Sequence, residues 1–188
     1  MSRDYNVLID KLPCYITLFG KKYQVHTSFK NWIRISLLIE DGGLSDAKTT
    51  AKILKLCYRE SLPENIGSAI LGMLAFLNGD TNFFVSSDKK SAERLYSFHD
   101  DADVIFSSFY EKYNIDLEKS NMHWYKFLAL FEGLADDNPF ATRLKIRATD
   151  ETKIKDADKR RKLKELKIKY AIKRNVEIDV AKNISSLF

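Results

Sequence analysis

Apolar residues between Asn121 and Leu134 recur at intervals of three and four, the spacing that places side chains on one face of an α-helix. The face comprises Trp124, Phe127, Leu130, Phe131 and Leu134. Burying its aromatic rings would contribute several kcal/mol at roughly 25 cal/mol per Å² of apolar area, so we expect this helix at the centre of the core. Gly133 is predicted to end the helix in a left-handed conformation.

Six further segments show helical spacing together with start or stop residues. The first three have the predicted inner faces Phe29, Trp32, Ile33 and Leu37, then Ala47, Ala51, Leu54 and Tyr58, then Ile66, Ile70, Leu74 and Leu77. Ser28, and Ser45 with Asp46, precede the first two, while Pro63 lies in the first turn of the third and Gly79 ends it. The others run from Ser97 to Tyr113, from Asn138 and Pro139 to Arg147, and from Asp150 or Thr152 through a basic run.

Two short β-prone runs, Tyr15–Leu18 and Lys22–Val25, predict a hairpin with Gly20 at its turn. Because an isolated hairpin is marginally stable, we expect it to pack on the helices or on another subunit. The sequence therefore predicts a mainly α, single-domain bundle of about six or seven helices with a small N-terminal β-hairpin. In this interpretation residues 1–172 form the domain, with the hairpin at about 10–27, and residues 173–188 form a helical or disordered C-terminal extension.

The composition supports a helical fold, because the 188 residues include only 7 glycines and 3 prolines. No apolar run approaches the roughly 20 residues of a membrane helix, and the first residues lack the apolar region of a signal peptide. We therefore expect a soluble protein that stays in the compartment where it is made.

The sequence contains no glycine-rich phosphate loop, nucleophile elbow or HExxH motif. Cys14 and Cys57 are expected to be free thiols of a reducing compartment. The three histidines, His26, His99 and His123, are too scattered to suggest a zinc site. We therefore expect no enzymatic activity, no cofactor and no metal.

Three carboxylates, Asp100, Asp101 and Asp103, lie at the start of the Ser97–Tyr113 segment. Such a cluster could serve metal or acid–base chemistry, but carboxylates in a first turn also complement the helix dipole, and we favour that explanation. The predicted apolar face of this helix comprises Ala102, Ile105, Phe106, Phe109, Tyr110 and Tyr113.

Positive charge is concentrated near the C-terminus, where residues 151–174 include 11 basic and 4 acidic residues. The candidate binding residues of this run are Lys159, Arg160, Arg161, Lys162 and Lys164. The favoured explanation of this run is a solvated helix face, and the second is a contact with another protein. A nucleic-acid contact is the third, because no aromatic residues are interleaved with the cations.

Two apolar segments lie outside the predicted bundle. One is an island in the polar stretch Asp80–Ser91, which we interpret as the longest loop and a candidate for disorder until a partner orders it. The other is a stripe with helical spacing in the C-terminal extension, which needs a surface to dock on. The island consists of Phe83, Phe84 and Val85, and the stripe consists of Val176, Val180, Ile184 and Leu187.

In the segment MHWYKFLALFEGL, the central helix resembles the signature of a family of small phage and prophage proteins from the tail-gene region of long-tailed phages of Gram-positive bacteria. The flanking segments RLYSFHDDADVIFSSFYEKYNIDL and KIRATDETKIKDADKRRKLKELKIKYAI are similar to that family's preceding and closing helices. The resemblance covers roughly Asp10–Ile172, and Tyr125 stands where the family more often has a second tryptophan. Its core signature is Trp124, Phe127, Phe131 and Gly133.

The resemblance implies a tail assembly chaperone, because the family's genes commonly lie just before the tape-measure gene. Such a protein keeps the tape-measure protein soluble and helps recruit tail-tube subunits in the cytoplasm of the bacterial host during phage assembly. A second copy of the chain is a further candidate partner, and a membrane is not. In this hypothesis the two apolar segments cover apolar helical segments of the tape-measure protein, and the Lys159–Lys169 run adds charge complementarity. The alternatives are a structural virion protein of the tail or head–tail connection and, less favoured, a nucleic-acid-binding phage protein.

Overall fold

The computed structural model describes residues 5–79 and 95–173. Contacts divide these residues into two compact units, each of which is described by itself. Unit 1 consists of residues 5–79 and 121–129, and unit 2 consists of residues 95–120 and 130–173. The described residues form seven α-helices and one N-terminal hairpin, so the predicted mainly α fold is confirmed.

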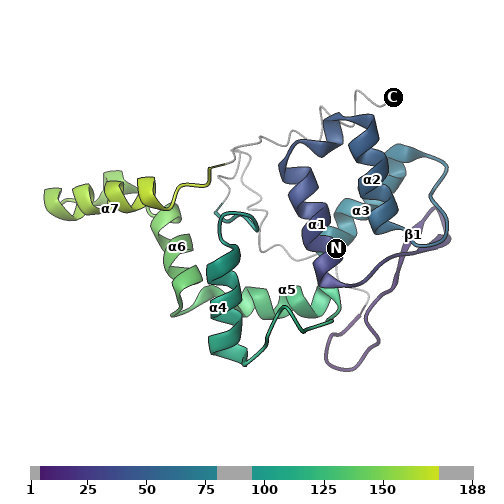
Figure 1. Ribbon diagram of the computed structural model, residues 1–188, viewed down its shortest axis with the longest axis horizontal. Coiled ribbons are helices and arrows are strands. Elements are labelled where there is room, and N and C mark those ends of the chain that lie inside the picture. Colours follow the sequence, from purple (N-terminus) through teal and green to yellow (C-terminus); the bar gives the residue numbers. More distant parts are fainter. Residues whose placement is uncertain (1–4, 80–94, 174–188) are drawn as a thin grey trace. The chain divides into compact units, whose positions relative to one another are not determined.

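Figure 1 shows the order of the elements along the chain. Unit 1 contains β1 (Tyr15–Leu18), β2 (Lys21–Gln24), α1 (Phe29–Glu40), the 3-10 turn η1 (Gly43–Ser45), α2 (Ala47–Cys57) and α3 (Ile66–Asn78). Unit 2 contains α4 (Ala102–Tyr113), the 3-10 turn η2 (Gly133–Ala135), α6 (Pro139–Ala148), the 3-10 turn η3 (Glu151–Lys153) and α7 (Ala157–Lys169). Helix α5 (Trp124–Glu132) is shared between the units: residues 124–129 belong to unit 1 and residues 130–132 belong to unit 2.

The hairpin turns through Phe19 and Gly20, whose φ angles are 49° and 77°. Positive φ at both central residues is typical of a type I′ turn, whose twist matches that of the two strands. The turn pairs Leu18 with Lys21, so β2 begins one residue earlier than predicted. The hairpin packs on α3 at Gly72, where a Cβ atom would collide with side chains of β1. The expectation that the hairpin lies on the helices is therefore confirmed.

Two buried tryptophans lie at the centre of the unit 1 core. Trp32 of α1 and Trp124 of α5 stack with their ring centroids 6.3 Å apart. Each indole N–H donates a hydrogen bond to a backbone carbonyl, that of Trp32 to His26 and that of Trp124 to Leu77 at 2.9 Å. A buried indole without an acceptor would lose free energy, so these two bonds fix where the rings lie. The predicted central position of Trp124 is confirmed.

The predicted inner faces of α1 and α2 are partly wrong. The buried residues of these helices are Phe29, Trp32, Ile35, Ile39, Glu40, Thr50, Ile53, Leu54 and Cys57. Ile33 and Leu37 are only half-buried, and Ala47 and Ala51 are exposed. Apolar residues surround more than one side of each helix, so spacing alone does not decide which side faces the core.

Helix α3 shows the same ambiguity most clearly, because none of its 13 residues is charged. Its buried residues are Gly67, Ala69, Ile70, Gly72, Met73 and Phe76. Ile70 was predicted correctly, but Ile66 is exposed and Leu74 is half-buried. Gly79 ends the helix with a φ of 56°, as expected, but the predicted start is wrong, because Asn65 caps the helix and Pro63 lies before it.

A cluster of aromatic rings forms the core of unit 2. Phe131 of α5 lies 5.3 Å from the ring of Tyr96, 5.6 Å from that of Phe98 and 5.0 Å from that of Phe140, measured between centroids. The segment before α4, the end of α5 and the start of α6 therefore meet at one residue. The predicted core position of Phe131 is confirmed.

Gly133 does not adopt a left-handed conformation, so its predicted role as a cap is wrong. The chain continues from α5 directly into η2, with right-handed helical geometry at Glu132. The glycine is needed for a different reason, because a Cβ atom there would overlap the Tyr113 hydroxyl. That hydroxyl donates a hydrogen bond to the Leu130 carbonyl at 2.8 Å. A close approach between α4 and the end of α5 thus requires Gly133.

Asp101, just before α4, is completely buried and ion-paired. Its Oδ2 accepts hydrogen bonds from Arg147 at 2.6 Å and the Ser97 N–H at 3.0 Å, and its Oδ1 accepts from Arg147 at 2.9 Å and Arg143 at 3.0 Å. Burial by itself raises the pKa of the Asp101 carboxyl, but the bonds from Arg147, Ser97 and Arg143 outweigh burial and lower the pKa below its ordinary value. The dipole explanation fits Asp103 in the first turn of α4 and is wrong for Asp101.

The same two arginines connect this carboxylate to the C-terminal end of α7. Arg147 Nε donates to the Tyr170 carbonyl at 2.7 Å, and one of its terminal nitrogens also donates to the Leu95 carbonyl at 2.8 Å. The guanidinium carbon of Arg143 lies 5.2 Å from the centroid of the Tyr170 ring, within cation–π range. The segment before α4, α6 and the end of α7 are therefore joined through one cluster, which we call the Asp101 cluster (Asp101, Arg143, Arg147 and Tyr170).

Asp101→Asn should destabilise the protein by roughly 3 kcal/mol, because it leaves the buried Arg147 charge without its partner. Urea unfolding followed by circular dichroism measures this change. Asp103→Asn is the matched control, since Asp103 is exposed and its loss should cost under about 1 kcal/mol. Equal stability of the two variants would contradict the structural role of the Asp101 cluster.

His123, at the N-terminal end of α5, holds the N-terminal segment of unit 1. Its Nδ1 accepts a hydrogen bond from the Tyr125 N–H at 3.0 Å, so the ring carries its proton on Nε2, which lies 2.8 Å from the Pro13 carbonyl oxygen. Protonation of Nδ1 would place its N–H group against the Tyr125 N–H, so two hydrogen-bond donors would face one another. Burial lowers the pKa of the His123 imidazole below its ordinary value, although the bond to Pro13 opposes this shift.

The free energy of unfolding should therefore fall as the pH drops below about 6.5, the ordinary pKa of histidine. The sign follows from the lowered pKa: the contribution of His123 is complete above the pKa of the unfolded chain and is lost as pH falls through the lower pKa of the folded protein. Urea unfolding between pH 8 and pH 5 measures this dependence. His123→Gln should flatten it and His26→Gln, at an exposed position, should not. An unchanged slope in His123→Gln would refute the assignment.

Candidate partner-binding helix

Helix α7 carries all five basic residues that were singled out in the sequence. Its start was predicted wrongly, because Asp150 begins only the short turn η3, where its side chain accepts from the Thr152 N–H. The helix itself begins after Asp156, whose carboxylate accepts from the backbone N–H groups of Asp158 at 2.9 Å and Lys159 at 3.0 Å. A carboxylate at this position satisfies amides that have no partner within the helix.

None of the 13 residues of α7 is buried. Leu163 is half-buried, Leu166 is exposed, and Ile168 is 79% exposed. Isolated helices shorter than roughly 12–15 residues are marginal in water, so α7 depends on its contacts with η3 and α6, on the Asp156 cap and on Tyr170 in the Asp101 cluster. Helix α7 is thus a surface element with one half-buried side and no buried face.

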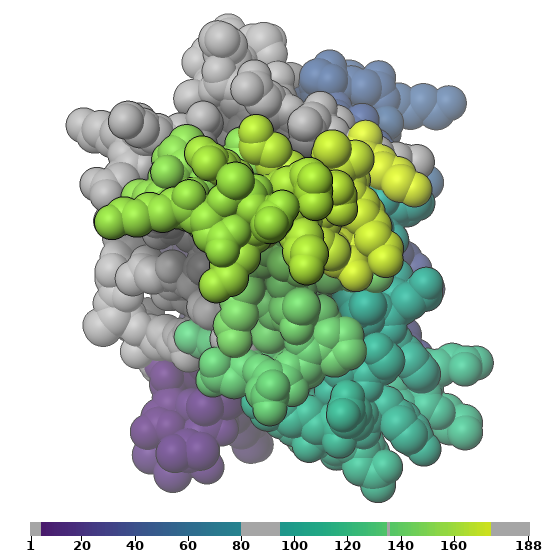
Figure 2. Space-filling view, turned by 90° about the vertical axis from the view of Figure 1, so that its left-hand side faces the viewer, coloured from purple at the N-terminus to yellow at the C-terminus, as the bar shows by residue number. Residues whose placement is uncertain are grey.

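The side chains of α7 include seven cations and two carboxylates. The cations are Lys159, Arg160, Arg161, Lys162, Lys164, Lys167 and Lys169. Arg161 lies 3.4 Å from Asp158 and Lys164 lies 3.7 Å from Glu151, both as ion pairs at exposed or half-buried positions that contribute little to stability. Figure 2 looks onto α7, whose atoms (yellow-green) face the viewer above those of α6 (green).

The structure describes only some of the remaining predicted site residues. Phe83, Phe84, Val176, Val180 and Ile184 lie outside the described residues, as does Val85. The core signature Trp124, Phe127 and Phe131 is buried, and Gly133 permits close packing, so these four residues serve the fold.

Exposed apolar side chains in other elements were missed in the sequence. Phe106 and Tyr110, predicted on the inner face of α4, are exposed, because Ile105, Ser108 and Phe109 take the buried side of the helix. Val7, Leu8 and Ile9 near the N-terminus are also exposed. For α4 the signal available in the sequence was Ser108, a small residue that lies on the buried side of the helix.

The described residues contain no group of three or more His, Cys, Asp or Glu side chains that could hold a metal ion. In the same part of the chain no helix is long and apolar enough to cross a membrane. Cys14 is exposed and Cys57 is buried, and neither forms a disulfide. Burial raises the pKa of the Cys57 thiol, which keeps it protonated at neutral pH.

These features define a mainly α protein whose candidate site is a basic helix on its surface. Comparison with family models identifies the particular family: the model described as "Bacteriophage Gp15 protein" matches residues 8–172. The chain therefore belongs to this family of bacteriophage proteins, which confirms the phage origin implied by the resemblance. No curated protein and no solved structure matches the chain.

Asp156→Ala should loosen α7 without affecting the rest of unit 2, because it removes one capping carboxylate worth about 1 kcal/mol. Amide hydrogen exchange in α7 should then become roughly fivefold faster, since 1 kcal/mol corresponds to about that factor. Asp158→Ala, at the second residue of the helix, is the control and should have a smaller effect. Unchanged exchange in Asp156→Ala would mean that contacts other than the cap hold α7.

Proposed function

We propose that the protein is a non-enzymatic tail assembly chaperone that keeps the phage tape-measure protein soluble and helps recruit tail-tube subunits. It would act in the cytoplasm of the bacterial host during phage assembly. Membership of a bacteriophage protein family supports a role in the phage, and the resemblance of its helices to a tail-region family supports the chaperone. The observation that carries the proposal is α7, a helix with seven cations and no buried side chain.

Helix α7 suits a partner that has apolar segments flanked by acidic residues. Its cations would accelerate encounter and select a partner of opposite charge, while the exposed Leu166 and Ile168 would supply apolar contact. Such charge-assisted contacts are easily reversed, as a chaperone that leaves the finished particle requires. The Asp101 cluster would keep the end of α7 fixed, which lowers the entropy lost on binding.

A structural protein of the tail or head–tail connection is the second candidate, because an exposed helix also suits a permanent interface. Mass spectrometry of purified virions distinguishes the two, since a structural protein stays in the particle and a chaperone does not. Binding of nucleic acid to the cations of α7 is the third candidate, and it predicts a steep loss of affinity with salt.

Co-expression of the chain with the tape-measure protein of the same phage should raise the soluble fraction of the latter, and the two should co-purify. Lys159→Glu with Lys162→Glu, two exposed changes in the first half of α7, should abolish most of this effect. Lys48→Glu with Lys52→Glu makes the same charge change at exposed positions in the first half of α2 and should leave the effect intact.

Two results would count against the proposal. If the tape-measure protein stays insoluble with the unchanged chain, the chaperone function is wrong. If both double variants work as well as the unchanged chain, the chaperone function stands but α7 is not its binding element.

A further inference from the structure

The backbone of β1 has one edge that does not pair with β2. The Val25 N–H donates to the Cys14 carbonyl at 3.0 Å, so these two residues form a hydrogen-bonded pair between the strands. Hydrogen-bonded and non-hydrogen-bonded pairs alternate along an antiparallel ladder, so the next pair, Tyr15 with Gln24, is non-hydrogen-bonded. The direction of the Gln24 carbonyl agrees, because this group accepts from the N–H of Arg59, which lies outside the hairpin, at 3.0 Å.

The N–H and C=O groups of Tyr15 and Thr17 therefore point away from β2. In the part of the chain that the structure describes, no hydrogen bond reaches these two donors and two acceptors. The outer edge of β2 is different, because residues 57–59 pair with its C-terminal end. Monomeric proteins usually protect an open edge with a charge, a proline or a bulge. Residues 15–18, Tyr-Ile-Thr-Leu, contain no charge and no proline, and they pair with β2 without a bulge.

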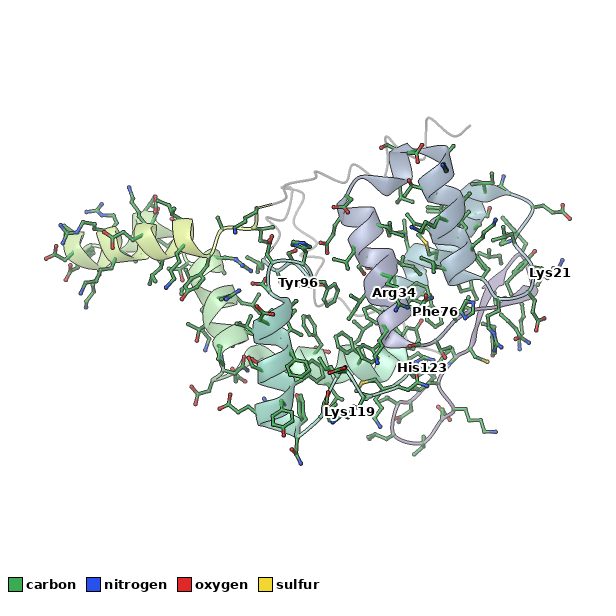
Figure 3. All side chains as sticks on the ribbon, viewed as in Figure 1. Lys21, Arg34, Phe76, Tyr96, Lys119 and His123 are labelled. Carbon is green, nitrogen blue, oxygen red and sulfur yellow. The ribbon has the colours of Figure 1, made fainter. Side chains whose placement is uncertain are left out.

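The open edge is short and is limited at both ends. At one end Pro13 has no N–H, and its carbonyl oxygen lies 2.8 Å from His123 Nε2. At the other end Phe19 and Gly20 have φ angles of 49° and 77°, which turn the chain out of the strand. Figure 3 labels Lys21, the first residue of β2 after this turn. A longer strand of another protein would run past both ends of the edge without finding further groups to bond.

We propose that the open edge of β1 pairs with the same edge of a second copy of this chain, in antiparallel direction about a two-fold axis at Ile16. In this register Tyr15 of each copy lies opposite Thr17 of the other. Each pair makes two hydrogen bonds, so every outward N–H and C=O group of both edges is used. Sliding the register by two residues would place Thr17 opposite Pro13, or Tyr15 opposite Phe19, and would leave outward groups unpaired. The two edges therefore match each other in length and in the order of donors and acceptors.

The side chains beside the edge also fit a second copy. Tyr15 and Thr17 are exposed, and an aromatic residue opposite a β-branched one is a favourable cross-strand pair. Since β1 has no charged residue, its two copies do not repel each other. Phe19 is 93% exposed, and the same register places Pro13 of the second copy opposite it. The inference does not depend on the proposed function, because the pairing involves this chain alone.

Sedimentation of the full-length chain over a dilution series tests the pairing. Because the edge is short, we expect a dimer that dissociates on dilution. Thr17→Pro removes one outward N–H from each copy and keeps the hairpin, since proline is tolerated in an edge strand where the N–H faces solvent. The dissociation constant of the dimer should rise at least about tenfold. Lys22→Pro is the matched control: Lys22 lies opposite Thr17, so this change removes an outward N–H from β2, and the constant should stay within about twofold.

Amide hydrogen exchange of the unchanged chain gives a second measurement that needs no variant. The Tyr15 and Thr17 N–H groups should exchange rapidly in dilute solution and become protected as the protein concentration rises. The Lys22 N–H should show no such dependence. Circular dichroism checks that both proline variants are folded, and if Thr17→Pro does not fold, the exchange measurement decides.

Three results would overturn the inference. A chain that stays monomeric throughout the dilution series would exclude the dimer. A dimer in which the Tyr15 and Thr17 amides stay unprotected, or which a folded Thr17→Pro variant leaves intact, would place the interface elsewhere. Protection of these two amides in a monomeric chain after addition of the tape-measure protein would assign the edge to a strand of that protein.

Discussion

The carboxylate of Asp101 is the constraint on which the structure of unit 2 depends. An ionised group can be buried only when it is paired and hydrogen-bonded, so Arg147, Arg143 and the Ser97 N–H must all be in place together. The arginines belong to α6, and they also hold Tyr170 at the end of α7. A helix without a single buried side chain thus keeps its position, and the fold of unit 2 and its candidate binding surface have the same physical origin.

In unit 1 the buried polar side-chain groups are paired by hydrogen bonds to backbone carbonyls and not by an ion pair. The indoles of Trp32 and Trp124 both donate to carbonyls outside their own helices, and His123 joins α5 to the N-terminal segment. Each bond removes a polar group from water without leaving it unpaired. Each unit therefore pairs its buried polar groups internally, by an ion pair in unit 2 and by bonds to backbone carbonyls in unit 1.

Helix caps formed by neighbouring residues were predictable from the sequence. Contacts between side chains far apart in the chain were not. Asn138 caps α6 and Gly79 ends α3 as expected, because caps involve neighbouring residues. Asp101 was misjudged because its arginine partners lie more than forty residues away in the chain. The inner face of α3 was misjudged because apolar residues surround it. The basic residues of α7 were identified from composition alone, whereas the lack of any buried side chain depends on packing that no pattern reveals.

We propose that α7 is the helix through which this bacteriophage protein binds its partner. Amide hydrogen exchange of the full-length chain, with and without the co-purified tape-measure protein, tests it most directly. Because no side chain of α7 is buried in the free chain, its amides should exchange readily and become protected in the complex, while those of α2 stay unchanged. Unchanged exchange in α7 upon formation of a stable complex would contradict the claim.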